Sequence, residues 1–427
     1  MQTFTRRQRS LLEGGNSMRS DVVIIGAGPS GLTAAIELAK NHVSVTVVDE
    51  YFRPGGRLLG QLYEDPYLPE DEKVWNGKEI AQQLTLEAEK LGVQIFTNTV
   101  VWSVKEGWEV ELTGSVKGTL TAKALLLATG SIEKALPVPG WTLPGVYTVG
   151  AAQNFTNLHR VCVGRKVIIV GIDPLSLSVM TEMKKAGIEV IGVTLPPPVK
   201  ELGNGYTPTD ALRSLEQVAD FAPNRWMRQL GKALLGRFDR FIAHALRLNL
   251  LKVDGTSIYL RKALLSIEGE TEVEAVTLQD VSVDGELIGK PYRKEVDAVC
   301  LSGGLYPSMD LAQVGGCKIV HIPELGGMVP LHGPDMSTLV KGLFLSGNIT
   351  GIEGAKVAMA QGKVAAVSIL GYLGKKGTQS LDEAMEEVEI ARKQSPIKFM
   401  PDIEIGRQKM LECWREHWNE GYDYLSM

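Results

Sequence analysis

The apolar positions of the chain fall into short runs that predict buried strands, and a helix-like segment follows the first of them. The first run is Val22 to Ile25, and the helical pattern extends from about Leu32 to Lys40. A second apolar run, Val43 to Val48, ends at Asp49. This order of strand, helix and strand is one complete βαβ unit, so the pattern predicts an α/β fold with a parallel sheet.

The turn between the first strand and its helix has the sequence G-x-G-x-x-G, from Gly26 to Gly31. Gly26 is expected to make the tight turn, Gly28 to let the backbone approach a pyrophosphate, and Gly31 to let helix and strand pack closely. The diphosphate would lie at the helix N-terminus, against free N–H groups and the positive end of the dipole. Asp49 follows about 20 residues later and would hydrogen-bond ribose hydroxyls. These features predict a dinucleotide site rather than a glycine-rich turn of another α/β fold.

The loop after Asp49 carries glycines and arginines, which suits a segment that wraps a cofactor, although a plain surface loop has the same composition. It contains Glu50, Gly56, Arg57 and Gln61. The next segment, Asp65 to Asn76, is rich in proline and acids and predicts an exposed excursion.

A helix and several strands complete this first unit. Gly77 to Leu91 predicts an amphipathic helix, and the alternating segments predict strands over Val93 to Thr97, Val100 to Val104 and Trp108 to Leu112. Ala124 to Gly130 reads ALLLATG and predicts a buried strand that ends in a turn of small residues. Small side chains at that turn would let a ligand approach the backbone closely.

Lys166 to Val193 repeats the strand–helix–strand pattern, but its glycine fingerprint is broken. Gly171 holds the first position, whereas Asp173 and Ser176 replace the second and third glycines. A carboxylate there would repel a pyrophosphate, and Asp173 instead suits the cap of the helix, with Pro174 in its first turn. Neither a ribose-binding acid nor an arginine pair for a 2′-phosphate follows the second strand. The sequence leaves open whether this unit binds NAD(P), an adenine nucleotide or nothing.

Helix and strand signals alternate again after this second unit. Thr209 to Leu251 predicts helix, and Tyr259 to Val299 predicts strands. Leu343 to Gly347 predicts another buried strand with a glycine turn, and Lys356 to Leu370 predicts a helix of small residues. This arrangement places a second helix N-terminus at the end of a strand, which is a second candidate site for an anion or for the edge of a flavin.

The two ends of the chain differ in character. Met1 to Ser20 carries arginines but no apolar segment of an export signal, and we expect the first ~17 residues to be poorly ordered. The tail, Gly371 to Met427, predicts two charged amphipathic helices, about Leu381 to Lys393 and Ile403 to Asn419. They suit a helical cap or an element that docks a partner.

Composition narrows the functional class. The 427 residues are enough for two or three domains, and the formal net charge of -5 gives no attraction for nucleic acid. Four cysteines lie far apart without a C-x-x-C spacing, which predicts buried thiols in a reducing compartment and no metal or iron–sulfur site formed by this chain alone. No apolar run approaches the ~20 residues needed to span a bilayer.

Three separated segments then match one family pattern: Gly26 to Gly31, Ala124 to Gly130 and Gly342 to Gly362. They resemble the thioredoxin-reductase-like superfamily of flavoproteins with two dinucleotide domains. The resemblance covers roughly Asp21 to Leu370, and it implies one FAD domain built from both ends of the chain with a nicotinamide domain inserted. The redox disulfide of that family has no counterpart here, which argues against dithiol chemistry. Asn348 stands where the family has aspartate, and its side-chain oxygen can still accept a hydrogen bond.

A closer resemblance covers Leu143 to Phe155, Gly326 to Thr338 and Gly347 to Gly362. These segments are similar to α subunits of heteromeric dehydrogenases such as dye-linked proline dehydrogenase, sarcosine oxidase, opine oxidase and hydrogen cyanide synthase. In such complexes, the resemblance implies, a separate flavoprotein β subunit oxidises the amine or amino acid on its own FAD. The α subunit holds a second nucleotide or flavin and helps to pass electrons onward. Many such chains end in a cysteine-rich segment, whereas this tail offers only Cys413, so any cluster must lie on a separate small iron–sulfur subunit or be absent.

The predicted fold is therefore α/β, with two Rossmann-like three-layer units, the second inserted into the first, and a helical C-terminal tail. The expected boundaries are a leader over 1–20, FAD-binding parts over 21–140 and 299–370, an inserted NAD(P)-like unit over 160–298, and the tail over 371–427.

The predicted FAD-binding residues come from the three matching segments, from the loop after the ribose-binding acid and from one strand of the first unit. They are Gly26, Gly28, Pro29, Ser30, Gly31, Asp49, Glu50, Gly56, Arg57, Gln61, Val101, Ala128, Thr129, Gly130, Gly347, Asn348, Gly354 and Ala355. No catalytic residue and no metal ligand is predicted. His159, His332 and Lys356 are candidates to approach the flavin, with ordinary core or solvated side chains as the alternative.

The predicted function is that of an FAD-binding α subunit of a multi-subunit amine or amino-acid dehydrogenase of the proline, hydroxyproline, sarcosine, glycine or opine type. It would accept electrons from a catalytic flavoprotein β subunit in a cytoplasmic hetero-oligomer, with peripheral attachment to the inner face of the membrane left open. The alternatives are a stand-alone NAD(P)H-dependent FAD reductase and a non-redox scaffold stabilised by a nucleotide.

Overall fold

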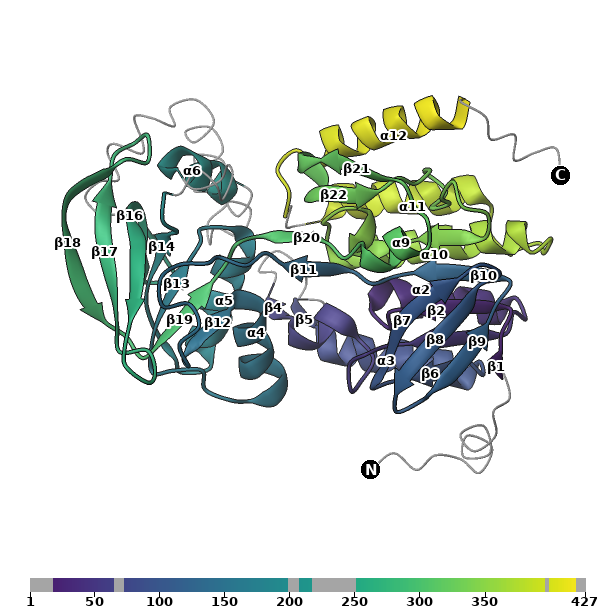
Figure 1. Cartoon of the computed structure of the whole chain (residues 1–427), viewed down its shortest axis with the longest axis horizontal. Coiled ribbons are helices and arrows are strands. Elements are labelled where there is room, and N and C mark those ends of the chain that lie inside the picture. The colour runs from purple at the N-terminus through teal and green to yellow at the C-terminus, as the bar shows by residue number, and fades with distance from the viewer. Residues whose placement is uncertain (1–17, 65–72, 199–206, 217–250, 396–398, 420–427) are drawn as a thin grey trace.

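The computed structural model describes residues 18–64, 73–198, 207–216, 251–395 and 399–419. Within these ranges the chain forms two lobes, each built around a sheet with a parallel centre, and extended strands cross between them (Figure 1). The first lobe carries both the N-terminal segment and the C-terminal helices. The second lobe is formed by the middle of the chain, as expected for an inserted unit.

The first lobe has a five-stranded parallel sheet in the order β23-β10-β2-β3-β6. Its side chains alternate between two cores: Val22 and Ile24 face the helices, whereas Val23 and Ile25 face a second sheet, β1-β9-β8-β7. Both faces are covered, so the strands are continuous apolar runs. The strand bounds are β2 Val22–Ile25, β3 Val45–Val48, β6 Gln94–Phe96, β10 Ala124–Leu127 and β23 Leu343–Leu345. The covering sheet consists of β1 Met18–Arg19, β7 Thr99–Lys105, β8 Glu109–Gly114 and β9 Gly118–Thr121.

Three helices cover the other face of this sheet. They are α2 Pro29–Lys40, α3 Gly77–Lys90 and α10 Ala355–Tyr372. α2 and α10 pack directly on each other, and Gly362 makes this possible because a Cβ there would lie 2.4 Å from the Ser30 carbonyl oxygen. Both helices begin at the carboxyl ends of parallel strands, so their N-termini point to the same edge of the sheet.

The second lobe has an eight-stranded sheet whose main path is β12-β19-β13-β14-β16-β17-β18. Its first five strands on that path are parallel and the last two pairings are antiparallel. α5 Pro174–Lys185 packs on one face through a core that includes Val167 and Ile169, while Ile168 and Val170 enter the core of the opposite face. The strand bounds are β12 Val146–Thr148, β13 Lys166–Val170, β14 Glu189–Leu195, β15 Lys252–Val253, β16 Thr256–Glu268, β17 Ala275–Val281, β18 Leu287–Glu295 and β19 Ala298–Leu301.

Two antiparallel strands, β11 Ser131–Glu133 and β20 Leu305–Pro307, form the crossing between the lobes (Figure 1). The chain leaves the first lobe through β11, directly after β10, and returns through β20 before it reaches β23. This topology confirms the predicted α/β fold with one Rossmann-like unit inserted into another. The second lobe also contains α4 Val149–Asn154, the π-helical turn η2 Phe155–His159 and α6 Pro208–Glu216.

The C-terminal tail packs on the first lobe. α11 Leu381–Gln394 lies against α10, and its N-terminus is closed by a capping box between Ser380 and Glu383. α12 Ile403–Asn419 buries Met410 and Trp414 against η6 Pro323–Leu325 and the hairpin of β21 Ile319–Ile322 and β22 Gly327–Pro330. The two predicted tail helices are therefore present, with nearly the expected bounds.

Several elements differ from the sequence prediction. α2 begins at Pro29 rather than Leu32, because Gly28 is the N-cap and proline suits the first helical position. Val74–Asn76, placed by the sequence in an exposed excursion, forms β5 and pairs with β4 Leu62–Glu64; the earlier part of that excursion lies outside the described residues. The helix predicted from Thr209 is described only as far as Glu216, and the predicted leader also lies outside the described ranges.

Candidate functional site

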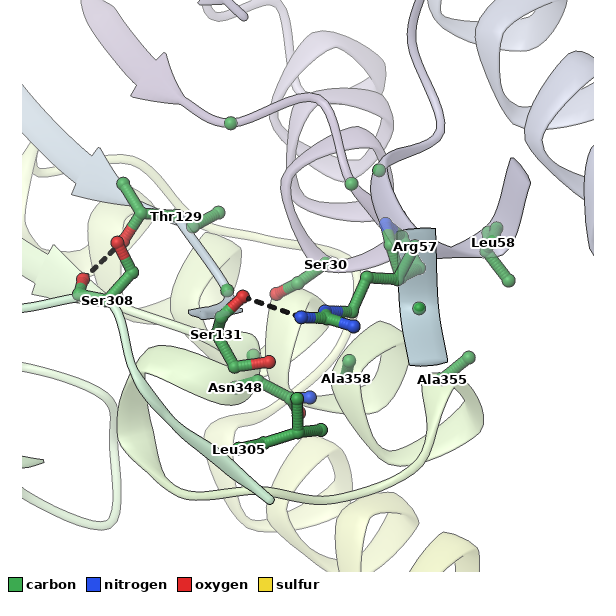
Figure 2. A pocket seen from close by; sticks show the side chains of 18 of the residues that line it. Ser30, Arg57, Leu58, Thr129, Ser131, Leu305, Ser308, Asn348, Ala355 and Ala358 are labelled. Atoms are coloured by element: carbon green, nitrogen blue, oxygen red, sulfur yellow. Dashed lines mark hydrogen bonds between the residues drawn. The ribbon is translucent and has the colours of Figure 1, made fainter. Parts of the chain in front are cut away.

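A cavity of about 660 Å³ opens where the carboxyl edge of the first sheet meets the second lobe. Its walls come from the first glycine turn, the β10 turn, the start of α10 and the start of α4 and α5. Figure 2 shows Ser30, Thr129 and Asn348 from different segments gathered around this space. The volume falls in the range of cofactor and small-molecule sites.

The structure brings together the residues that the sequence selected from distant segments. Every predicted FAD-binding residue lines the cavity except Gly31. Gly31 lies behind the wall, where a Cβ would come within 2.0 Å of the Gly26 carbonyl oxygen. Gly31 therefore allows helix α2 to pack on its strand, as its place in the fingerprint suggested.

Gly26 and Gly28 have different roles in the wall. Gly26 has φ +106° and a Cβ there would lie 2.3 Å from the Ala128 carbonyl oxygen, so the turn itself requires glycine. Gly28 has φ -75°, and a Cβ there would meet nothing within 4 Å. Gly28 lines the cavity, so the space beside it is open to a ligand rather than to another part of the chain.

Two helix N-termini open into the cavity without a side-chain cap. α2 has Gly28 as its N-cap and α10 has Gly354, and neither residue has a side chain that could accept hydrogen bonds from the first turn. Free N–H groups and the positive end of the helix dipole make such a terminus a binding site for an anion. A diphosphate therefore fits the α2 terminus, and the α10 terminus offers a second site of the same polarity.

Asp49 lies at the carboxyl end of β3 and lines the cavity. Its carboxylate accepts hydrogen bonds from the backbone N–H groups of Ala27, at 2.6 Å, and Tyr51, at 2.8 Å. Burial raises the pKa of Asp49, while these two hydrogen bonds act to lower it. A carboxylate has about four acceptor positions, so Asp49 retains capacity for ribose hydroxyls, and the exposed Glu50 next to it adds a second carboxylate.

Arg57 reaches across the cavity toward the turn after β10. Its Nη2 donates to the Ser131 carbonyl oxygen at 3.2 Å, as Figure 2 shows, and its Nη1 lies 3.9 Å from Glu133. Glu133 in turn accepts a hydrogen bond at 2.9 Å from the backbone N–H of Gly150, at the start of α4. The loop after Asp49 is thus tied to the crossing strand and to the second lobe.

Glu353 is a buried carboxylate in the wall, and it connects the cavity to the tail helices. It pairs with Arg392 of α11 at 2.7 Å and with Arg407 of α12, and it accepts a hydrogen bond from Gln361 at 3.2 Å. Gln361 also accepts a hydrogen bond at 3.0 Å from the backbone N–H of Gly347, a residue that lines the cavity. The tail therefore helps to hold the β23–α10 turn in place.

The sequence did not predict a group of wall residues that includes Glu353 and several from the second lobe. Ser131 and Glu133 directly follow the β10 turn, which was their only local signal. The others become neighbours of the glycine turn only in the folded chain. They are Gln153, Asn154, Leu175 and Ser178.

The basic candidates lie in different places. Lys356 lines the cavity, with its Nζ 5.6 Å from the centre of the Trp75 ring. His332 is buried outside the lining and donates to the Pro330 carbonyl oxygen at 2.9 Å; burial and the Arg407 charge lower its pKa to about 3. His159 is also absent from the lining and lies 3.4 Å from the Tyr51 hydroxyl. Neither histidine is placed as a wall residue of the cavity.

All four cysteines are free, and none lines the cavity. Cys300 and Cys317 are buried, which raises the pKa of both thiols to about 12. The prediction of buried thiols is wrong for Cys162, which is exposed, and Cys413 is half-buried. Within the described ranges no group of His, Cys, Asp and Glu has the arrangement of a metal site.

The second fingerprint, at the start of α5, is closed by its own side chains. Asp173 is the N-cap: it accepts a hydrogen bond from the Ser176 N–H at 2.9 Å, and the Ser302 hydroxyl donates to it at 2.6 Å. Ser176 completes a capping box, and Pro174 occupies the first turn. The predicted cap is confirmed, and a carboxylate fills the position that a pyrophosphate would need.

Replacing Asp173 with alanine is expected to lower the free energy of unfolding by about 1 kcal/mol, because one helix cap is lost. The affinity for FAD is expected to stay unchanged, since this helix end is closed to ligands. Urea unfolding and a flavin titration measure the two effects, with Asp173→Ser as the control that keeps a capping oxygen. A parallel loss of FAD affinity would contradict the assignment.

The family model described as pyridine nucleotide-disulphide oxidoreductase matches residues 20–362. The chain belongs to the pyridine nucleotide-disulphide oxidoreductase family. Together with the two Rossmann-like units and the fingerprint at Gly26 to Gly31, membership in this family identifies an FAD-dependent oxidoreductase. The predicted cofactor FAD is thereby confirmed. Within the part of the chain that the structure describes, no helix is both long and apolar enough to cross a membrane.

Within the pyridine nucleotide-disulphide oxidoreductases, the chain is similar to one of the subunits of opine oxidase from Agrobacterium tumefaciens strain Ach5, with 27% identity over 376 residues, or 84% of this chain and 67% of the relative. It is also similar to the HcnB subunit of hydrogen cyanide synthase from Pseudomonas protegens, with 26% identity over 361 residues, or 83% and 71% of the two chains. The fold is similar to that of L-proline dehydrogenase from P. horikoshii, with a TM-score of 0.61 and 19% identity, over 88% of this chain and 60% of that chain. The family resemblance predicted from the sequence is confirmed.

Proposed function

We propose that this chain is the FAD-binding α subunit of a multi-subunit amine or amino-acid dehydrogenase of the proline, hydroxyproline, sarcosine, glycine or opine type. One contrast carries the proposal: the α2 and α10 termini open into the cavity, whereas the α5 terminus is capped by Asp173. The chain thus has a well-formed place for FAD and a closed one where NAD(P) would donate electrons. Electrons would then arrive from another protein.

In this proposal the glycine turn and the start of α2 hold the FAD diphosphate, and the end of β3 holds the adenosine ribose. Gly28, Pro29 and Ser30 face the diphosphate, and Asp49 with Glu50 binds ribose hydroxyls. FAD supplies the redox-active ring, and the chain's own residues position it and set its electrostatic environment. The α10 terminus and Lys356 place positive charge at the far end of the same cavity, where it would favour an electron-rich ring.

The remaining predicted wall residues complete the proposed FAD site. Arg57 and Gln61 belong to the loop that closes over the cavity, and Asn348 offers an amide in the β23–α10 turn, where its Oδ1 already accepts a hydrogen bond from the Glu353 N–H at 3.1 Å. The rest form backbone or apolar walls. They are Gly56, Val101, Ala128, Thr129, Gly130, Gly347, Gly354 and Ala355.

The proposed partner is a catalytic flavoprotein β subunit that oxidises the substrate, and any iron–sulfur cluster belongs to a separate small subunit. Opine oxidase and hydrogen cyanide synthase are both named as having subunits, which supports a hetero-oligomer. The lack of a paired cysteine near the cavity agrees with electron transfer rather than dithiol chemistry. We place the complex in the cytoplasm, with peripheral attachment to the inner face of the membrane as the alternative.

Two other functions remain as alternatives. A stand-alone NAD(P)H-dependent FAD reductase needs a working second fingerprint, and Asp173 is unfavourable to it. A second nucleotide in the inserted unit, NAD(P) or an adenine nucleotide, would have to bind without the α5 terminus. A non-redox scaffold would bind FAD without transferring electrons.

Isolation of the native complex tests the proposal. The tagged full-length chain is expected to bring down a second flavoprotein, and the complex is expected to reduce a dye with an amine or amino acid. Mass and absorption spectra then identify each cofactor. A lone chain that carries out the complete dehydrogenase reaction by itself would contradict the assignment of catalysis to a partner.

A further inference from the structure

Glu182 is a carboxylate on α5 that is only 5% exposed, and it lies where the inserted lobe meets the first lobe. Gln153 of α4 donates to both of its oxygens, at 3.1 and 3.0 Å, and Asn157 of η2 donates to Oε2. Asn157 also donates to the Gly60 carbonyl oxygen, in η1 Gly56–Gly60 of the first lobe, at 2.7 Å. The carboxylate therefore joins elements of both lobes.

The cavity wall reaches this carboxylate at two points. Gln153 and Ser178 both line the cavity. The Ser178 hydroxyl donates to Glu182 Oε1 at 3.0 Å, one helical turn away on α5. A hydroxyl can accept a proton on one side and release its own on the other. Ser178 is thus a direct proton link between a buried acid and the cavity.

The proposed function gives this acid a task, because electrons that enter a flavin are accompanied by protons. We propose that Glu182 is a positioning residue that supplies and stores the proton for the cavity, through the Ser178 hydroxyl. This inference rests on the proposed FAD site and on electrons from a partner's reduced flavin. It concerns how this chain manages protons, which the family resemblance does not address.

The step balances in protons and electrons. Two electrons arrive from the reduced flavin of the partner subunit. Glu182 releases the proton of its carboxylic acid to the Ser178 oxygen, while Ser178 releases its own hydroxyl proton into the cavity, to a ring nitrogen made basic by those electrons. The Glu182 carboxylate that remains is held by Gln153 and Asn157, and water later restores its proton.

The charge environment suits a group that gains and loses a proton near neutral pH. Burial raises the pKa of Glu182 to about 7, against the hydrogen bonds of Gln153, Ser178 and Asn157 and the charge of Lys185, which act to lower it. α4 carries no charged residue, and the charged side chains of β13 and β14 are exposed. The nearby groups on α5, β4, η1 and η2 are Lys185, which pairs with Glu64 at 3.1 Å, Arg57, which is 3.9 Å from Glu133, and His159, which is 3.4 Å from the Tyr51 hydroxyl.

This location also sets the sign of a pH effect on stability. The folded-state pKa of Glu182 lies above its ordinary value of 4.5. The folded chain therefore holds this proton more tightly than the unfolded chain does, and the resulting stabilisation is lost as the pH rises from about 4.5 to about 7. Glu182→Gln is expected to remove this slope. That result alone would fit a purely structural acid, so a redox readout is needed.

The test uses electrochemical reduction of the FAD-loaded full-length chain in weakly buffered solution with a pH-indicator dye. Electrons entering the cavity add negative charge, which raises the pKa of a neighbouring carboxyl. Near pH 7 the wild type is therefore expected to bind up to one more proton per electron pair than Glu182→Gln. Glutamine keeps the size of the side chain and cannot release a proton. Equal proton uptake by both chains at every pH overturns the proposal.

Ser178→Ala separates the link from the store. We expect the same equilibrium proton uptake as in the wild type, reached at least about tenfold more slowly, because one relay hydroxyl is missing. The control is Thr181→Val on the same helix, whose hydroxyl bonds to the Leu177 carbonyl oxygen instead. An unchanged rate in Ser178→Ala overturns the route. A wild-type chain that takes up no FAD overturns the proposed function itself, so the two failures are distinguishable.

Discussion

The Gly28→Val chain is expected to fold normally and to lose FAD. The backbone of Gly28 has φ -75°, which any residue can adopt, and a Cβ there meets nothing within 4 Å. Only the cavity lies beside it, so the valine side chain would occupy the space through which the diphosphate reaches the N–H groups of α2. We expect FAD to bind at least about 100-fold more weakly, which corresponds to about 2.7 kcal/mol.

A flavin-fluorescence titration measures this loss, and urea unfolding of the apo-chain checks the fold. The matched control is Gly371→Val, because Gly371 is also surrounded by open space but lies at the far end of α10. The control is expected to bind FAD like the wild type. If Gly28→Val retained the wild-type affinity, the diphosphate could not lie at the α2 terminus.

Glu353→Gln is expected to lower the free energy of unfolding by about 3–5 kcal/mol, the cost of leaving buried charges without their partner. Arg392 and Arg407 both pair with this carboxylate, and all three side chains are largely buried. Glutamine keeps the size and the hydrogen bond to Gln361 but removes the charge between the two arginines. Denaturant unfolding measures the effect. The control is Glu389→Gln, which removes an exposed partner of Arg392 and is expected to cost under about 1 kcal/mol.

The same carboxylate sets a pH dependence with the opposite sign to that of Glu182. Burial acts to raise the pKa of Glu353, but the charges of Arg407 and Arg392 outweigh it, and the pKa is lowered from 4.5. Its contribution to stability is therefore present above about pH 4.5 and is lost as the pH falls through the lowered pKa. Glu353→Gln is expected to lose this acid-induced slope. Equal acid unfolding curves for variant and wild type would show that the cluster does not stabilise the tail.

The parts of the fold that the sequence predicted best have strong local patterns. The buried runs at Val22–Ile25 and Ala124–Leu127 are apolar at every position, because parallel strands are covered on both faces. The cap of α5 was also readable, since Asp173 and Pro174 are typical of a helix start. The strand Val74–Asn76 was missed because its pairing with β4 depends on a partner strand, and its proline- and acid-rich surroundings suggested a loop.

The candidate site shows the same division. Fingerprint residues such as Gly28 and Asp49 could be selected because their spacing reflects one local βαβ unit. Glu353 could not, because its importance depends on Arg392 and Arg407, which follow 39 and 54 residues later in sequence. Ser178 and Glu182 belong to the inserted unit, and only the docking of the two lobes brings them to the cavity wall.

The most direct test of the central claim is anaerobic stopped-flow absorption of the FAD in the isolated chain. Our account predicts that excess NADH or NADPH leaves this flavin oxidised, because Asp173 closes the second nucleotide site. The flavin is expected to bleach only when the partner flavoprotein and its amine or amino-acid substrate are added. Rapid bleaching by NADH or NADPH alone would contradict the account and would make the chain a stand-alone reductase.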